Sequence, residues 1–164
     1  MNHSKIIVGI GNTLRGDDGV AAELLDRLGA KTISSDVVCL HQLAIESAEM
    51  ISHYADVLFV DASVALEPGH WKCETIEARG DADPRISHSM TPHSVVKLAR
   101  QLYGKNVNSY VLSVGAGHFD LLQGFSQEVE VAIPSIAEFV RQWSCTPRSS
   151  DERAEALQTC SNAH

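Results

Sequence analysis

Four short apolar runs, separated by segments with helical spacing, constrain most strongly how this chain folds. The first, Lys5–Ile10, is nearly continuous, which is typical of a strand buried on both faces of a parallel sheet. Val20–Leu28 carries apolar residues at helical spacing and is followed by Gly29, a common helix stop. The other three runs are Val37–Leu40, Val57–Val60 and Tyr110–Val114. This alternation predicts an α/β fold: a single doubly wound, mostly parallel sheet with helices on both faces.

Three further helices and one edge strand complete the predicted fold. The helices are expected over Ile45–Tyr54, Pro92–Leu102 and Ser126–Trp143, and the edge strand over Trp71–Ile76. Thr91 has the position of an N-cap, because Pro92 after it suits the first helical turn. Pro134 is expected to bend the last helix. Residues 79–90 are polar and are predicted to form a loop.

The length of 164 residues predicts one domain. We place the α/β domain at residues 1–144 and a polar, disordered tail at residues 145–164, where aliphatic residues become rare. The first residues lack the layout of a signal peptide, and no apolar run is long enough to span a bilayer. The protein is therefore expected to be cytoplasmic.

Charge and cysteine usage argue against several classes of partner and site. The formal net charge is −8, so nucleic acid and anionic membrane surfaces are unfavourable partners. The cysteines form no CxxC pair and are widely spaced, which argues against a structural zinc site and a disulfide framework. They are Cys39, Cys73, Cys145 and Cys160.

Two acids and a histidine are expected at one edge of the predicted sheet. Asp18 lies at the start of a helix, Asp61 directly follows an apolar run, and His93 falls in the first turn after Thr91. In open α/β sheets this edge is where ligands bind. Two carboxylates and an imidazole suit a hard-to-borderline metal ion with positions left open. The positive end of the helix favours a neutral His93 ring, which can bind metal.

Each of these residues also has a purely structural interpretation. Asp17 is expected to cap the helix that follows, and Asp18 could be a surface acid that stabilises the helix dipole. Asp61 could cap its loop, and His93 could be an exposed residue without a role. His41, His88 and His118 lie near predicted element ends; solvated loop positions are favoured over roles in supporting a site.

Several common catalytic and binding motifs are missing. The turn with Gly9, Gly11 and Gly16 does not match GxGxxG, and Asp17 with Asp18 would repel a pyrophosphate at that helix start. No GxSxG elbow and no HExxH motif occur. No nucleophile is assigned, and the catalytic residues stay open.

The sequence resembles the endopeptidases that mature the large subunit of nickel-iron hydrogenases, over roughly residues 5–143. Gly11-Asn12-x-Leu14-x-x-Asp17-Asp18-Gly19 is similar to the family's N-terminal signature, and Val60-Asp61-Ala62 and Thr91-Pro92-His93 are similar to its later landmarks. His41-Gln42-Leu43 and Ser89-x-Thr91-Pro92-His93 resemble the branch that serves cytoplasmic NAD(P)-linked or bidirectional hydrogenases. The segment 119–127 departs from the acidic, glycine-rich stretch and Leu-Ser-Pro that members often carry.

The resemblance implies a peptidase that removes a short C-terminal extension from the large-subunit precursor once nickel is installed. It implies that Asp18, Asp61 and His93 are the metal-binding positions, and that the nickel is supplied by the substrate. Two other hypotheses stay open. One is a non-catalytic metal-binding or nickel-chaperone protein on the same fold. The other is a nucleotide-binding module, which the paired acids disfavour.

Overall fold

A five-stranded, mostly parallel sheet forms the centre of the computed structural model, which describes residues 4–29, 32–77 and 90–147. The strand order is β2-β1-β3-β5-β4; β4 at one edge runs antiparallel to β5, and the other neighbouring pairs are parallel. The bounds are β1 Lys5–Ile10, β2 Asp36–Leu40, β3 Asp56–Ser63, β4 Trp71–Ile76 and β5 Asn108–Gly115. The predicted α/β fold, including the edge strand, is confirmed.

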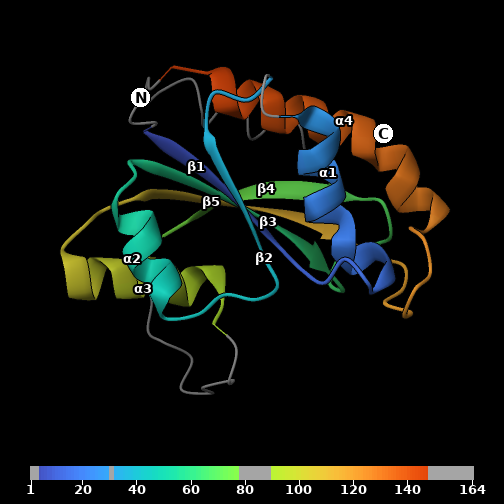
Figure 1. Ribbon diagram of the computed structural model, residues 1–164, viewed down its shortest axis with the longest axis horizontal. Coiled ribbons are helices and arrows are strands. Elements are labelled where there is room, and N and C mark those ends of the chain that lie inside the picture. The colour runs from blue at the N-terminus through green and yellow to red at the C-terminus, as the bar shows by residue number, and fades with distance from the viewer. Residues whose placement is uncertain (1–3, 30–31, 78–89, 148–164) are drawn as a thin grey trace.

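Helices cover both faces of the sheet (Figure 1). On one face α1 (Val20–Leu28) and α4 (Gln127–Cys145) pack against each other, and on the other face α2 (Glu46–Ser52) packs against α3 (Pro92–Tyr103). Side chains alternate along the strands between the two cores. Ile7 and Leu58 belong to the first core and Val8 and Phe59 to the second, and all four are fully buried. The continuous apolar runs therefore reflect a sheet that is buried on both faces.

The start of α3 follows the sequence prediction closely. Thr91 is the N-cap, with an extended backbone, and Pro92 is the first helical residue. The Thr91 hydroxyl accepts a hydrogen bond from the Ser94 backbone N–H at 3.2 Å, while the Ser94 hydroxyl accepts one from the Thr91 N–H at 2.8 Å. This reciprocal pair is a capping box, which fixes where the helix begins. Gly104 ends α3 in the left-handed region.

The strand that carries Asp61 and the last helix both extend beyond their predicted ends. β3 continues to Ser63 because it stays paired with β5, so Asp61 lies within the strand opposite Ser113. The last helix continues through Cys145, and the Lys5 ammonium donates to the carbonyls of Trp143 and Thr146, each at 2.6 Å. These contacts hold the end of the helix against the start of β1.

Some predictions fall on parts of the chain that the structure does not describe. Residues 148–164 of the tail predicted at 145–164, and nearly all of the loop predicted at 79–90, lie outside the described residues. Among the described helices, none has the length and apolar character needed to cross a membrane.

Candidate functional site

The turn after β1 holds Asp18 by direct contact between backbones. Gly11 has a φ of 142°, and a Cβ there would stand 2.0 Å from the Asp18 carbonyl oxygen, so only glycine fits this approach. The next residue, Asn12, donates its backbone N–H to the Asp18 carboxylate at 2.7 Å. Asp18 itself lies in a short 3-10 helix, η1 (Gly16–Gly19). The carboxylate is therefore fixed at the carboxyl end of β1.

Asp61 stands at the carboxyl end of neighbouring β3 and interacts with Asp18. Its pKa is raised from 3.8 to about 6, first because the side chain is removed from water and second because the Asp18 carboxylate is close. A hydrogen bond from the Ala62 backbone N–H offsets part of this effect. The two carboxylates therefore form an acidic pair, Asp18 and Asp61, in which burial and the neighbouring charge disfavour the ionised form of Asp61.

His93 is the second residue of α3, and its side chain is exposed. The short connection from α3 to β5 returns the chain to the amino ends of the strands, so α3 begins on the side of the acidic pair. Among the described residues, no group of three or more His, Cys, Asp or Glu side chains is arranged to hold a metal ion. The structure thus brings Asp18 and Asp61 together but does not close a three-ligand site with His93.

Asp17 has a different role from the helix cap that the sequence suggested. Neither η1 nor α1 has a side-chain hydrogen bond at its N-cap. The Asp17 side chain is instead completely buried and faces the segment between β5 and α4. The expectation of a cap is wrong, because four donors from that distant segment converge on the carboxylate.

Four hydrogen bonds satisfy the buried Asp17 carboxylate. The Ser126 backbone N–H and hydroxyl donate at 2.7 and 2.8 Å, and the backbone N–H groups of Gly117 and His118 donate at 2.6 and 3.3 Å. Burial alone would raise the pKa of Asp17, but these hydrogen bonds outweigh it and hold the pKa below its usual value. Asp17 therefore joins η1 to the start of α4 while remaining ionised.

Gly117 and Ser126 are site-supporting residues that the sequence interpretation missed. Ser126 also caps α4, because its hydroxyl accepts from the Val129 N–H at 3.4 Å. The sequence contained one signal for this segment, the Gly115-Ala116-Gly117 run after an apolar strand. The carboxylate that accepts hydrogen bonds from this run is determined by tertiary contacts, which no local sequence pattern encodes.

The remaining histidines have varied surroundings. The His118 ring packs against η1, since a Cβ on Gly16 would lie 2.6 Å from its Nδ1, and that nitrogen accepts from the Asp120 N–H at 3.4 Å. His41 is exposed after β2. His88 lies outside the described residues.

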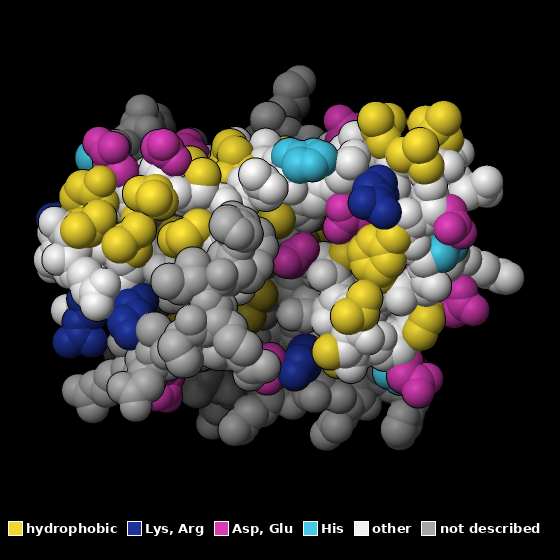
Figure 2. Space-filling view, turned by 90° about the horizontal axis from the view of Figure 1, so that it is seen from below, with side chains coloured by type: hydrophobic (Ala, Val, Ile, Leu, Met, Phe, Trp, Pro, Cys, Tyr) yellow, Lys and Arg dark blue, Asp and Glu magenta, His cyan; other side chains and the backbone are white. Residues whose placement is uncertain are grey.

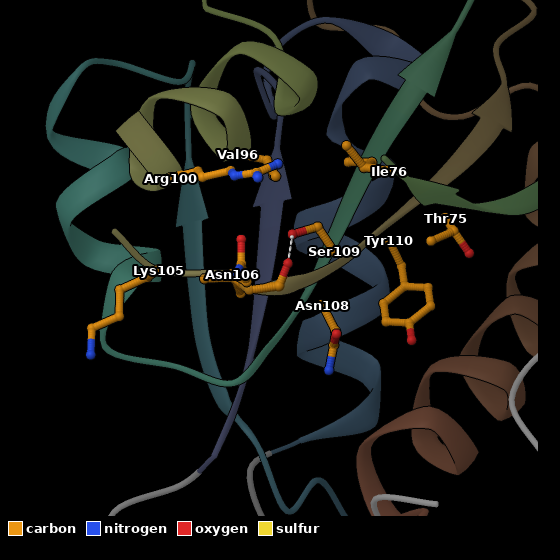
Figure 3. A pocket seen from close by; sticks show the side chains of 10 residues that line it. Thr75, Ile76, Val96, Arg100, Lys105, Asn106, Asn108, Ser109 and Tyr110 are labelled. Carbon is orange, nitrogen blue, oxygen red and sulfur yellow. Dashed lines mark hydrogen bonds between the residues drawn. The ribbon is translucent and has the colours of Figure 1, made fainter. Parts of the chain in front are cut away.

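A small pocket lies at the amino end of β5, whereas the acidic pair lies at the carboxyl ends of β1 and β3 (Figure 3). Its volume is about 150 Å³, and its lining comes from the end of α3, the start of β5 and the end of β4. The lining includes Arg100, Lys105, Asn108 and Tyr110 but no carboxylate and no histidine. It is therefore separate from the site predicted by the sequence.

The fold is shared with several solved structures, although the sequence matches no protein-family model and no curated protein sequence. The NiFe hydrogenase maturation protease HycI from Thermococcus kodakarensis aligns with a TM-score of 0.66 and 18% identity, over 85% of this chain and 92% of that chain. The hydrogenase maturating endopeptidase HybD from Escherichia coli aligns with a TM-score of 0.65 and 18% identity, over 83% and 88%. The hydrogenase 2 maturation peptidase from a Thaumarchaeota archaeon gives 0.62 and 22%, over 85% and 96%. These similarities establish the fold over nearly the full length of each relative.

Proposed function

We propose that this protein is an endopeptidase that removes the C-terminal extension of a nickel-loaded hydrogenase large-subunit precursor. The observation that carries the proposal is the acidic pair at the carboxyl edge of a fold shared with hydrogenase maturation proteases. The motif residues that resemble that family include both members of the pair. The fold and the motifs support the same activity.

In this proposal the nickel belongs to the substrate, and Asp18, Asp61 and His93 recognise it. Carboxylate and imidazole groups suit a borderline divalent ion, and a positive charge would relieve the repulsion that helps raise the pKa of Asp61. Among the described residues no complete three-ligand cluster exists. An ion that arrives with ligands from the precursor needs fewer ligands from this protein, and two carboxylates with one imidazole can complete its coordination.

Two finer features belong to the proposal. The precursor is assigned to a cytoplasmic NAD(P)-linked or bidirectional hydrogenase, on the resemblance of His41-Gln42-Leu43 and of the residues leading to His93. The protein would act in the cytoplasm, where such a precursor resides. Peptide hydrolysis needs a water molecule as the second reactant, and no side chain is assigned as the nucleophile.

Incubation with purified precursor in two forms tests the proposal. Nickel-loaded precursor should lose its C-terminal extension, detected as a mass decrease of the large subunit, while nickel-free precursor should stay intact. Binding of the nickel-loaded form without any cleavage would favour the alternative of a nickel chaperone. Equal cleavage of both forms would contradict nickel recognition.

A further inference from the structure

Large hydrophobic side chains are exposed around the acidic pair. Leu14 follows β1, Val64 follows β3, and Leu121 and Leu122 follow β5; their exposed fractions are 55%, 82%, 65% and 77%. These four residues, here named the apolar rim, lie on three loops at the edge of the sheet that carries Asp18 and Asp61. Figure 2 shows hydrophobic side chains beside acidic ones on the right of the molecule, the side on which Figure 1 labels α1. Exposed apolar groups gathered in this way are characteristic of interaction sites.

Backbone hydrogen bonds hold three members of the rim together. The Leu122 N–H donates to the Leu14 carbonyl at 2.8 Å, and Arg15 forms an antiparallel bridge with Leu121. The Leu14 N–H in turn donates to the Asn12 side chain at 2.9 Å, and Asn12 contacts the Asp18 carboxylate. The exposed leucines are therefore connected to Asp18 through an ordered chain of contacts.

Leu122 adopts an unusual backbone conformation. Its φ is 59°, the only positive value among non-glycine residues in the described parts of the chain. A leucine in the left-handed region is uncommon and costs free energy, and such strain often occurs at functional sites. Here the strained residue also leaves most of its apolar surface in water, so neither its conformation nor its burial accounts for a leucine at this position.

We infer that the apolar rim is the surface on which an aliphatic segment of the precursor docks, beside the precursor's nickel. This inference rests on the proposed function. The acidic pair offers two carboxylates to a cation of the partner, and the apolar rim on the surrounding loops offers aliphatic surface to the protein groups beside that cation. In protein interfaces, contacts that exclude water commonly surround the few residues that dominate binding. The rim thus supplies affinity for the protein part of the substrate, and the acidic pair selects for nickel.

Steady-state cleavage of nickel-loaded precursor by rim and control variants tests the inference. The rim variant is Leu121→Ser combined with Leu122→Ser, which leaves the backbone bridges available. The control variant is Leu102→Ser combined with Val131→Ser, because these residues are 60% and 73% exposed but lie on α3 and α4. We expect the rim variant to raise KM about tenfold or more with kcat within about twofold. The control should match the wild type, and circular dichroism should show that both variants fold.

The possible outcomes separate the two levels of the proposal. If the wild type cleaves the precursor and the rim variant shows an unchanged KM, the rim is not the docking surface and the proposed function stands. An equal rise in KM for the control variant would also overturn the inference, because the effect would not be local. If the wild type neither binds nor cleaves nickel-loaded precursor, the proposed function fails, and with it the partner assigned to the rim. Should the rim variant fail to fold, Val64→Ser provides the same comparison from the loop after β3.

Discussion

Asp17 and Asp61 are carboxylates at the same edge of one sheet, yet their surroundings have opposite effects. Four hydrogen bonds from Gly117, His118 and Ser126 surround Asp17 and keep its pKa low despite burial. Burial and the nearby Asp18 carboxylate raise the pKa of Asp61 to about 6. The hydrogen bond from the Ala62 N–H lowers this pKa, but by less than the other two effects raise it. The first is a satisfied structural anion, and the second is a carboxylate whose ionised form is disfavoured by burial and by its neighbour.

This difference separates the part of the edge that supports the fold from the part that is available for chemistry. Asp17 holds η1 against the segment before α4, and Asp18, the next residue, is presented toward Asp61. Of these two adjacent acids, Asp17 therefore stabilises the fold and Asp18 belongs to the acidic pair. Carboxylates whose pKa is raised by burial and a neighbouring charge are typical of binding and catalytic sites, which often lower the stability of the fold.

The largest expected effect on stability comes from Asp17→Ala. Removing the carboxylate leaves several buried donors without an acceptor, at about 1–3 kcal/mol each, so we expect a loss of about 3–5 kcal/mol in the free energy of unfolding at pH 7. The folded pKa is below 3.8, so this contribution is complete above that pH and is lost as the pH falls through the folded value. Denaturant unfolding at pH 7 measures the loss. Asp26→Ala, an exposed acid on α1, is the matched control, and an equal loss in both variants would contradict this role for Asp17.

The opposite sign is expected for Asp61→Asn. Because its folded pKa of about 6 exceeds the unfolded value of 3.8, Asp61 favours folding below pH 3.8, and that advantage disappears as the pH rises through 6. At pH 8 the neutral amide should therefore stabilise the protein, by about 1–3 kcal/mol. At pH 3.5 most of the gain should be lost, because the wild-type carboxyl is then largely protonated in both states. Urea unfolding at the two pH values decides this, and a destabilised variant at pH 8 would be incompatible with the account.

A smaller change is expected in the titration of Asp61 when its neighbour is neutralised. Asp18→Asn should lower the pKa of Asp61 from about 6, but the value should stay above 3.8 because burial is the larger cause of the shift. Carbon-detected NMR of the Asp61 carboxyl as a function of pH gives both values. An unchanged pKa in the variant would show that the two carboxylates do not interact.

His93→Ala should have the smallest effect on stability. The side chain is exposed on the first turn of α3, so the free energy of unfolding should change by no more than about 0.5 kcal/mol. Processing of nickel-loaded precursor should nevertheless be lost. His53→Ala, at the exposed end of α2, serves as the control for both measurements. Cleavage at the wild-type rate by His93→Ala would remove the imidazole from the site.

Local patterns were sufficient for most of the fold. The apolar run of β1 and the Thr91-Pro92 start of α3 each depend on neighbouring residues, and both were predicted at their observed positions. The end of β3 was placed too early, because its continuation past Val60 depends on pairing with β5 rather than on its own composition.

The site could be predicted from sequence only where it depends on neighbouring residues, and not where it depends on contacts between distant segments. Asp18 and Asp61 each follow a predicted strand of a parallel sheet, so the sequence predicts that both lie at the carboxyl ends of those strands. The effect of Asp18 on the pKa of Asp61 agrees with this expectation. The role of Asp17 could not be derived, since its donors are about a hundred residues away in the chain and include backbone groups that any residue possesses. An acid at a helix start predicts a cap unless the fold supplies stronger partners.

The most direct test of the account is the mass of the hydrogenase large subunit after incubation of nickel-loaded precursor with Asp61→Asn at pH 8, beside the wild type. The account predicts that the wild type removes the C-terminal extension and that Asp61→Asn leaves the precursor at full length, although this variant is the more stable protein. Removal of the extension by Asp61→Asn at the wild-type rate would contradict the claim that the acidic pair recognises the substrate's nickel.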